Sequence, residues 1–395
     1  MAPVLPTEII SVILSKLPVK TLLRFLCVCK SWNSLIKTPN FIKLHLNQTL
    51  ISSSDRYLLK WSKHTSPQYA DLDIHRNNLQ FSDFNHPLET QVVHLLGSCN
   101  GIVCISDSSK NNVFLYNPLT KSHRKLPANP IPPNINKATL VFGFGYDSKN
   151  DDHKVLMMVY GYNNKVFHSE AKMYSLSNNS WKSAQGIPYH LYSYGCHGIV
   201  VNETINYIVI KPVELKSCKL IASFDLETEI FSYMDCPNCS DKWSNLSMLL
   251  MEWDGCLCVM VDYQNDDFIV ECFEMWVMKE YGNKESWVRL FSICQPESIE
   301  AYMDIKPVVY SKDGRKILLE IDSLNFGWYD LKSNVFDRCT ALGLSDGAIN
   351  MTKYVGSLVL LEHEPRLVRE ILPRKNKKKN NDLDQFLSTG FKLRL

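Results

Sequence analysis

The pattern of apolar and polar residues divides the chain into a short helical start and a long remainder with strand-like runs. Before Pro18, apolar residues recur with the period of about 3.6 that marks a helix, at Ile9, Ile10, Ile13, Leu14 and Leu17. Two further segments with this period follow, one after Pro18 and one ending before Pro39, so the pattern predicts three short helices. So small a unit buries too little surface to fold alone, and we expect part of its apolar surface to rest on another part of the protein.

From about Asp55 onward the chain consists of short apolar runs separated by turn residues such as Asn, Asp, Gly and Pro. Runs of roughly four to eight residues with this punctuation are typical of β-strands. Asn100-Gly101 and Asp313-Gly314 are dipeptides that favour tight hairpin turns. The stretch at 143–148 has two glycines but lacks the third glycine of a phosphate-binding loop, so we interpret it as part of a hairpin.

An aromatic residue followed by a short turn recurs through this strand-rich region. Its positions are 58, 50, 52 and 53 residues apart, at Tyr116, Tyr174, Phe224, Trp276 and Tyr329. In three of these units a second aromatic residue lies seven positions further on, at Trp181, Phe231 and Phe336. A repeat of about fifty residues with about four strands is the signature of a β-propeller blade. We therefore expect a β-propeller in which the recurring aromatic residue packs between blades.

The number of blades follows from how much chain remains outside these units. The five units fill roughly residues 92–342, and strands are also expected at 56–84 and 348–362. Strands from both ends of the region could pair in a sixth blade, which would close the ring and remove exposed sheet edges. The sequence thus predicts a six-bladed propeller.

Composition limits the location and the partners. The net charge is +2, so no overall field points to nucleic acid or to an anionic membrane as a partner. The N-terminus has no basic segment ahead of a long apolar core, so we expect no signal peptide, and a cytoplasmic or also a nuclear location. The 13 cysteines are accordingly expected to be reduced and mostly buried.

Few residue patterns suggest chemistry. Three aspartates at 147–152 could bind calcium, but their spacing fits no EF-hand and a plain acidic turn explains them better. Cys236 and Cys239, followed by Cys256 and Cys258, come nearest to a zinc site, although the second pair lacks the zinc-ribbon spacing and falls in a strand. No Gly-x-Ser-x-Gly, phosphate-loop or His-Glu-x-x-His motif occurs. We therefore expect no catalytic residues, no metal and no cofactor.

The N-terminal residues resemble an F-box. The matching positions are Leu5, Pro6, Glu8, Ile9, Leu17, Pro18, Leu22, Arg24, Phe25, Cys27, Val28, Cys29, Lys30, Ser31 and Trp32. Members of that family use this helical module to dock on a Skp-family adaptor, which links them to a cullin and a RING subunit of a ubiquitin ligase. The resemblance covers the whole motif without a gap and implies such an adaptor as a partner.

Segments of the strand-rich region resemble the F-box-associated region of a large plant family, a kelch-like propeller. The matching segments are GSCNGIVCI (97–105), LYNPLT (115–120), FGFGYDSKNDDHKVL (142–156), FDLETEIF (224–231) and WVMKEYGNKESWVRLFSI (276–293). In that family the region selects the protein to be ubiquitinated, as in pollen S-locus F-box proteins and F-box regulators of immune receptors. The resemblance implies an unidentified target protein, in self-incompatibility or immunity, but no particular target, because specificity lies in variable loops.

Together these features predict an α+β multidomain protein. Residues 1–48 are expected to form a small three-helix F-box, residues 49–372 an all-β propeller for substrate recognition, and residues 373–395 a basic tail. The tail begins PRKNKKKNND, which we interpret as a solvated basic segment, with a nuclear localisation signal as the alternative.

The predicted function is that of a non-catalytic substrate receptor of a Skp-cullin-F-box ubiquitin ligase. We expect adaptor contact at Leu5, Pro6, Ile9, Ile13, Leu17, Pro18, Leu22 and Trp32. For Ile13, Leu22 and Trp32 a role confined to the core of the helices is an equally good interpretation, because fully apolar helix positions usually face a core. Target contacts are expected on propeller loops, which tolerate variation.

An alternative function is a propeller that binds a glycan or a small ligand, with a secondary link to degradation. Glycan binding would need exposed aromatic side chains beside carboxylates. Tyr189, Tyr192 and Tyr194 form the aromatic cluster that hints at such a site. An enzymatic propeller has no motif in its favour.

Overall fold

The computed structural model describes residues 5–62, 66–72, 78–83, 85–88, 93–129, 136–163, 166–192, 197–212, 218–238, 245–267, 269–294, 304–311, 313–322, 325–343 and 348–361. Chain contacts separate a unit of residues Met1–Leu361 from a second unit, Glu362–Leu395. The predicted basic tail at 373–395 lies outside the described residues. Within the described residues, no helix is long and apolar enough to cross a membrane.

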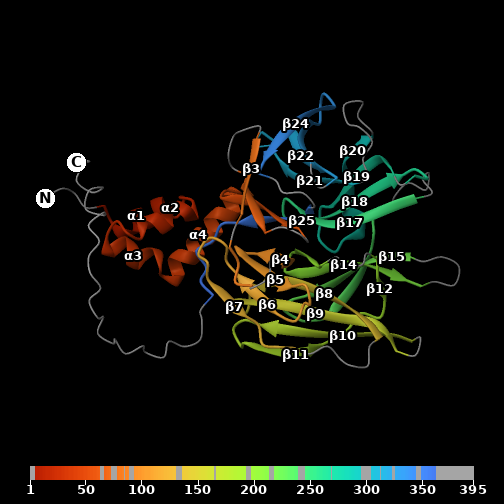
Figure 1. Ribbon diagram of the computed structural model, residues 1–395, viewed down its shortest axis with the longest axis horizontal. Coiled ribbons are helices and arrows are strands. Elements are labelled where there is room, and N and C mark those ends of the chain that lie inside the picture. Colours follow the sequence, from red (N-terminus) through yellow and green to blue (C-terminus); the bar gives the residue numbers. More distant parts are fainter. Residues whose placement is uncertain are drawn as a thin grey trace. The chain divides into compact units, whose positions relative to one another are not determined.

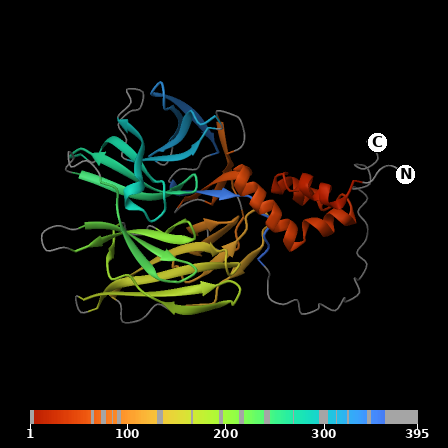
Figure 2. The same ribbon diagram turned by 180° about the vertical axis from the view of Figure 1, so that it is seen from behind.

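Four helices open the chain, coloured red in Figure 1 and seen from behind in Figure 2. They are α1 (Thr7–Leu14), α2 (Val19–Phe25), α3 (Lys30–Ile36) and α4 (Pro39–Ser52). The prediction of only three helices was wrong, because Pro39 begins α4 and does not merely end α3. The Thr38 hydroxyl accepts a hydrogen bond from the Phe41 amide at 3.2 Å, and proline is well tolerated at the first position of a helix.

Three sheets of the strand-rich region have four strands each. The first contains β4 (Val93–Cys99), β5 (Ile102–Asp107), β6 (Val113–Tyr116) and β7 (His123–Lys125). The second contains β8 (Asn136–Asp147), β9 (Asp152–Asn163), β10 (Val166–Ser175) and β11 (Ser180–Ala184). The third contains β17 (Asn245–Trp253), β18 (Cys256–Gln264), β19 (Val270–Met278) and β20 (Trp287–Cys294), with the 3-10 helix η1 (Lys284–Ser286) before β20.

Two further sheets complete the described fold. A five-stranded sheet contains β12 (His190–Leu191), β13 (Ile199–Val201), β14 (Thr204–Lys211), β15 (Cys218–Asp225) and β16 (Phe231–Asp235). An eight-stranded sheet runs in the order β21 (Ile305–Tyr310), β22 (Lys316–Ile321), β23 (Asn325–Asp330), β24 (Val335–Leu342), β3 (Asn78–Asp83), β2 (Gln68–Asp71), β1 (Arg56–Ser62) and β25 (Ala348–Val355). Four- and five-stranded antiparallel sheets in sequence order are the blades of a β-propeller.

The two ends of the propeller meet, as predicted. Strand β1 pairs antiparallel with β25, which is labelled in Figure 1, from Arg56 opposite Val355 to Ser62 opposite Ala348. However, β24 and β3 also pair, in parallel, so strand pairing gives four sheets of blade size and one of eight strands. Pairing alone therefore does not separate the six blades that the repeat predicts.

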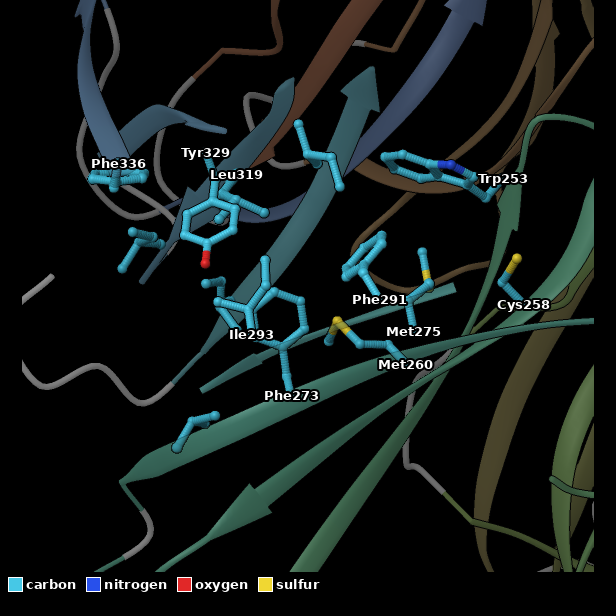
Figure 3. Close-up of a cluster of buried hydrophobic side chains, with 14 of the residues drawn as sticks. Trp253, Cys258, Met260, Phe273, Met275, Phe291, Ile293, Leu319, Tyr329 and Phe336 are labelled. Atoms are coloured by element: carbon cyan, nitrogen blue, oxygen red, sulfur yellow. The ribbon is translucent and has the colours of Figure 1, made fainter. Parts of the chain in front are cut away.

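Buried side chains fill the spaces between neighbouring sheets. One such cluster, shown in Figure 3, joins Phe273, Met275 and Phe291 of the β17–β20 sheet to Leu319 and Tyr329 of β22 and β23. The residues that recur seven positions apart prove to be cross-strand partners: Tyr174 faces Trp181, Phe224 faces Phe231, and Tyr329 faces Phe336. The first partner in each pair is at most 4% exposed. The seven-residue interval thus arises from one hairpin per blade, and the aromatic residues pack between sheets as predicted.

The expectation for the cysteines needs two corrections. Cys272 and Cys294, directly opposite each other on β19 and β20, form a disulfide and are not reduced thiols. Cys27, Cys29 and Cys218 are exposed and not buried. Cross-strand pairing of residues 22 positions apart depends on the register of the hairpin, which composition does not reveal.

Candidate functional site

One face of helix α1 exposes apolar side chains to solvent. Leu5 precedes the helix and Ile9, Val12 and Ile13 lie within it, and their exposed fractions range from 47% to 55%. At about 100° per residue, Ile9, Val12 and Ile13 fall within about a third of the helix circumference, and Leu5 lies just before the helix. We call these four residues the α1 face. Contiguous exposed apolar side chains on a folded protein mark an interaction site.

The opposite side of α1 packs into a small core, which we call the helical core. Its buried members are Leu14, Val19, Leu22, Ile36, Phe41 and Leu358. Leu358 follows strand β25, and half-buried Leu119, which follows β6, packs on the same cluster. The helices therefore rest on propeller residues, as the sequence predicted. Because the helical core takes the inner apolar side chains, the α1 face is left without a partner among the described residues.

Two Leu-Pro pairs set where α1 and α2 begin. Pro6 and Pro18 stand immediately before the two helices, with φ of −54° and −58°. The Pro6 carbonyl accepts hydrogen bonds from the amides of Ile9 and Ile10, both at 3.1 Å. The Pro18 carbonyl likewise accepts hydrogen bonds from two amides in the first turn of α2. Proline fixes φ near the value that a helix start requires, so each pair positions one helix.

A buried carboxylate joins α2 to the first propeller strand. The Asp55 Oδ2 atom accepts a hydrogen bond from the Val19 amide at 3.0 Å, and Oδ1 accepts one from the Tyr57 hydroxyl at 2.8 Å. Burial, together with the Asp55 charge, raises the pKa of Tyr57 far above its usual range, so this hydroxyl stays a donor. The Asp55 carbonyl in turn accepts from the Gly356 amide at 2.8 Å. Asp55 thus connects the start of α2 with the start of β1 and with the end of β25, which lie side by side at one end of this strand pair.

Two cations on the helices make further contacts with the propeller. The Lys20 ammonium on α2 lies 4.9 Å and 4.8 Å from the ring centroids of Tyr57 and Tyr69, which is cation–π geometry. Lys43 on α4 pairs with Asp151, in the turn between β8 and β9, and lowers the pKa of that carboxyl. These contacts hold the helices, and with them the α1 face, in a defined position on the propeller.

The structure sorts the predicted adaptor-binding residues by exposure. Leu5, Pro6, Ile9, Ile13 and Pro18 are exposed, Leu17 and Trp32 are half-buried, and Leu22 is fully buried. Leu22 belongs to the helical core, and half-buried Trp32 packs on Phe25 with 5.3 Å between ring centroids. Ile13 points to solvent. Sequence reasoning missed Val12, although its position three residues after Ile9 places it on the same helix face.

The aspartates of the turn between β8 and β9 are directed to different partners. Asp147 accepts from Lys154 at 2.8 Å, Asp151 pairs with Lys43, and Asp152 accepts from Ser175 at 2.6 Å. This turn is therefore held by ion pairs and hydrogen bonds. Across the described residues, no group of three or more His, Cys, Asp or Glu side chains is placed to hold a metal ion.

The cysteines of the proposed zinc pattern also separate. Cys256 and Cys258 share one sheet face and pack in the cluster of Figure 3, where Cys258 is labelled. Cys236 packs in a different hydrophobic cluster, against the other side of the β17–β20 sheet. Cys239 lies outside the described residues. The described geometry therefore does not bring these thiols to one point.

A cavity of about 620 Å³ lies at the inner strands of the propeller. Its lining comes from β1, β4, β8, β12, β13, β14, β17, β21, β22 and β25, so every sheet contributes. The wall is largely apolar, with Lys110, His197 and Tyr207 among its polar members. Pockets of roughly 300–1,000 Å³ with few polar groups are typical of small-molecule sites.

The predicted tyrosine cluster does not form one aromatic platform. Tyr189 packs edge-on against Tyr233, with 5.3 Å between ring centroids, whereas Tyr192 lies under the Lys219 ammonium and lines the cavity. Tyr194 lies outside the described residues. The two described tyrosines belong to different hydrophobic clusters, so they offer no shared surface for a sugar ring.

Comparisons with known proteins agree with the division of the chain into N-terminal helices and a propeller. The family described as "F-box domain" matches residues 3–44, and the family described as "F-box associated beta propeller domain" matches residues 48–363. The chain is 29% identical to the F-box protein CPR1 of Arabidopsis thaliana, covering 98% of this chain and 99% of that protein. It is 30% identical to the F-box protein At4g22390 of the same plant, covering 99% of each.

Among solved structures, an oligogalacturonate lyase from Vibrio parahaemolyticus is similar over 74% of this chain and 80% of that chain. The sequence identity is 8% and the TM-score 0.40. A likeness this remote carries no argument about function.

Proposed function

Because the chain belongs to the family of F-box proteins with an F-box-associated β-propeller domain, we propose that it is the substrate-recognition subunit of a Skp-cullin-F-box ubiquitin ligase. Members of this family are generally non-catalytic, adaptor-type proteins. In this proposal the helices dock on a Skp-family adaptor, and through it on cullin and RING subunits, while the propeller binds a target protein for proteasomal degradation. The observation that carries the proposal is the α1 face, with its unpartnered apolar side chains.

The role of the chain in this proposal is to raise the local concentration of the target at the ubiquitin-transfer centre. No group of the chain needs to touch the reacting atoms, because holding two partners together makes their encounter effectively intramolecular. This role is supported by a defined position of the helices on the propeller. The hydrogen bonds of Asp55 and the cation–π contacts of Lys20 fix that position.

The strength of docking follows from burial of the α1 face. Each of its four side chains is about half exposed, so covering one contributes about 1 kcal/mol, and covering all four contributes several. A carboxylate at two of these positions would instead be desolvated without a partner, which costs several kcal/mol and would abolish a micromolar complex.

The experiment is a pull-down of the full chain co-expressed with a Skp-family adaptor. The variant is Leu5→Asp with Ile9→Asp, and the matched control is Leu44→Asp with Leu50→Asp, two leucines of α4 that are 42% and 44% exposed. We expect the wild type and the control to bind and the α1 variant to fail. If the wild type does not bind, or if the two double variants lose binding equally, docking through the α1 face is refuted.

We further propose that the propeller has six blades, with the eight-stranded sheet counted as two. Its order of β21 to β24 and then β3 to β25 gives two sets of four, joined by three parallel residue pairs. A buried cluster with Leu58 and Phe81 from one set and Leu318 and Phe326 from the other lies between them, as between neighbouring blades. A crystal structure with one continuous sheet, and no core between its halves, would contradict this count.

A further inference from the structure

The cavity at the inner strands of the propeller has a polar corner on strand β8. This strand is at the edge of its sheet, so the backbone groups on its inner edge are not used by a strand ladder. The Lys110 ammonium donates to the Leu140 carbonyl at 2.9 Å, and the Phe142 amide donates to Nδ1 of His197 at 3.3 Å. Leu140 and Phe142 are two residues apart, about 7 Å along a strand. Lys110 and His197 are thereby placed side by side on the cavity wall.

Lys110 brings a positive charge that no described carboxylate balances. Within the described part of the chain, the one hydrogen bond of the Lys110 ammonium is to a backbone carbonyl. Two other lysines line the cavity, but each has a carboxylate: Lys306 pairs with Asp304, and Lys353 with Glu252. Burial lowers the pKa of Lys110, the direction expected for an ammonium that has lost water without gaining a counter-charge.

His197 contributes a neutral donor. Its Nδ1 accepts from the Phe142 amide, so the proton of the neutral ring lies on Nε2. Burial, with Lys110 and His94 nearby, lowers the pKa of His197 to about 3, so the ring is uncharged at neutral pH. The Nε2–H group is therefore a donor that adds no charge.

Tyr207 contributes a second neutral donor at the same corner. It lines the cavity and is 3% exposed, and its hydroxyl has no hydrogen-bond partner among the described residues. A Cβ atom on Gly143 or on Gly198 would lie 2.7 Å from this hydroxyl, so the hydroxyl borders the residues that follow Phe142 and His197. A buried hydroxyl without a partner destabilises the fold, and a bound acceptor would relieve that cost.

We propose that this corner binds the carboxylate of a small organic acid whose apolar body occupies the rest of the cavity. One uncompensated ammonium and two neutral donors match a single negative charge, whereas a doubly charged phosphate would bury an unbalanced charge. The wall beyond the corner supplies apolar contact through residues such as Leu96, Ile208, Leu250 and Val308. This site is independent of adaptor docking.

The test is isothermal titration of the full chain, in complex with its adaptor if that is needed for solubility. The probes are benzoate, 2-naphthoate, biphenyl-4-carboxylate and octanoate, with 2-naphthamide and 2-naphthylmethylamine as neutral and cationic matches. We expect at least one acid to bind, and 2-naphthamide and the amine to bind at least about tenfold more weakly than 2-naphthoate, because a hydrogen bond between charged groups is lost.

Variants locate the site. Lys110→Met should weaken binding of the acid by about tenfold or more, and Tyr207→Phe by a smaller factor of about three to ten. The matched control is Lys121→Met, since Lys121 is exposed and has a φ of 61° where Lys110 has 58°. Circular dichroism checks the fold of each variant, and Tyr207→Phe serves if Lys110→Met does not fold.

Three results would overturn the inference: no acid binds at millimolar concentration, the amide binds as tightly as the acid, or both cavity variants bind like wild type. Adaptor pull-down of the same variants separates the two proposals. Lys110→Met should bind the adaptor normally, so a failed titration would leave docking intact, and a failed pull-down of wild type would leave the cavity site intact.

Discussion

The bond between Asp55 and the start of α2 predicts a stability cost that can be worked out from the structure. Asp55→Ala removes the acceptor of two buried donors, the Val19 amide and the Tyr57 hydroxyl. Each donor left unsatisfied costs about 1–3 kcal/mol. Asp55 also has a φ of 52°, which alanine tolerates less well than aspartate, at a cost of roughly 1 kcal/mol. We therefore expect Asp55→Ala to lower the free energy of unfolding by about 3–7 kcal/mol.

Two further variants separate the causes. Asp55→Asn keeps one side-chain oxygen and tolerates the left-handed backbone, so we expect a smaller loss of about 1–2 kcal/mol. Ser53→Ala is the control, because Ser53 is exposed and has a φ of 47°, and it should change stability by less than about 0.5 kcal/mol.

The assays are urea unfolding followed by circular dichroism, and hydrogen exchange of the Val19 amide. A loss of about 3 kcal/mol at this junction would speed the exchange of that amide by about a hundredfold, if it exchanges through opening of the junction. The reasoning is refuted if Asp55→Ala loses less than about 1 kcal/mol and exchange at Val19 does not change.

Three other predictions follow from burial and charge. Leu22→Ala should lower the free energy of unfolding by about 2–5 kcal/mol, since Leu22 is fully buried, whereas Ile9→Ala should leave stability within about 1 kcal/mol of wild type and weaken adaptor pull-down. Lys154→Met should cost about 3–5 kcal/mol in urea unfolding, because it leaves the buried Asp147 carboxylate unpaired, whereas Lys149→Met at an exposed pair should cost less than about 1 kcal/mol. Burial alone would raise the pKa of Asp147, but hydrogen bonds from Asn150 and Lys154 lower it overall. The contribution of Asp147 to stability is therefore present above about pH 4 and is lost as the pH falls through the lowered pKa. The stability difference between wild type and Asp147→Asn should therefore shrink in urea titrations at decreasing pH.

Each of these predictions has a clear contrary result. Equal stability losses for Leu22→Ala and Ile9→Ala would mean that the division between helical core and α1 face is wrong. Equal losses for Lys154→Met and Lys149→Met would mean that burial does not strengthen the Asp147 pair. A stability difference between wild type and Asp147→Asn that stays constant on acidification would assign the effect of Asn to packing and not to charge.

Local patterns carried most of the fold that the sequence could predict. The Asn100-Gly101 turn joins β4 to β5 with φ of 50° and 74°, a backbone that this dipeptide adopts readily. The aromatic repeat identified the blades because each pair is set by one hairpin, which is a short-range feature. Each turn and each aromatic pair joins residues fewer than about ten positions apart, and their recurrence about every fifty residues is also visible in one sequence.

The features that the sequence did not reveal depend on distant contacts or on an ambiguous residue. Pro39 can end one helix or begin the next, and the hydrogen bond from Phe41 to Thr38 decides for the second. In α1 every apolar position fitted one stripe, but Leu14 faces the helical core while Ile9 faces solvent, and only packing against α2 to α4 separates them. The polar corner of the cavity unites residues 110, 197 and 207, which no spacing rule connects.

The short segment after β25 connects the stability of the docking helices to closure of the propeller. The Gly356 amide donates to the Asp55 carbonyl, and Asn117 donates to the carbonyls of Ser357 and Val359 at 2.9 Å and 2.8 Å. Leu358 completes the helical core. These contacts join residues more than 200 positions apart, so forming them alone would carry the entropic cost of closing a long loop. Pairing of β25 with β1 already brings the two segments together, so the contacts then form without that further cost. The helices thus reach their full stability only on a closed propeller, and a chain with an open ring presents a weakened docking module.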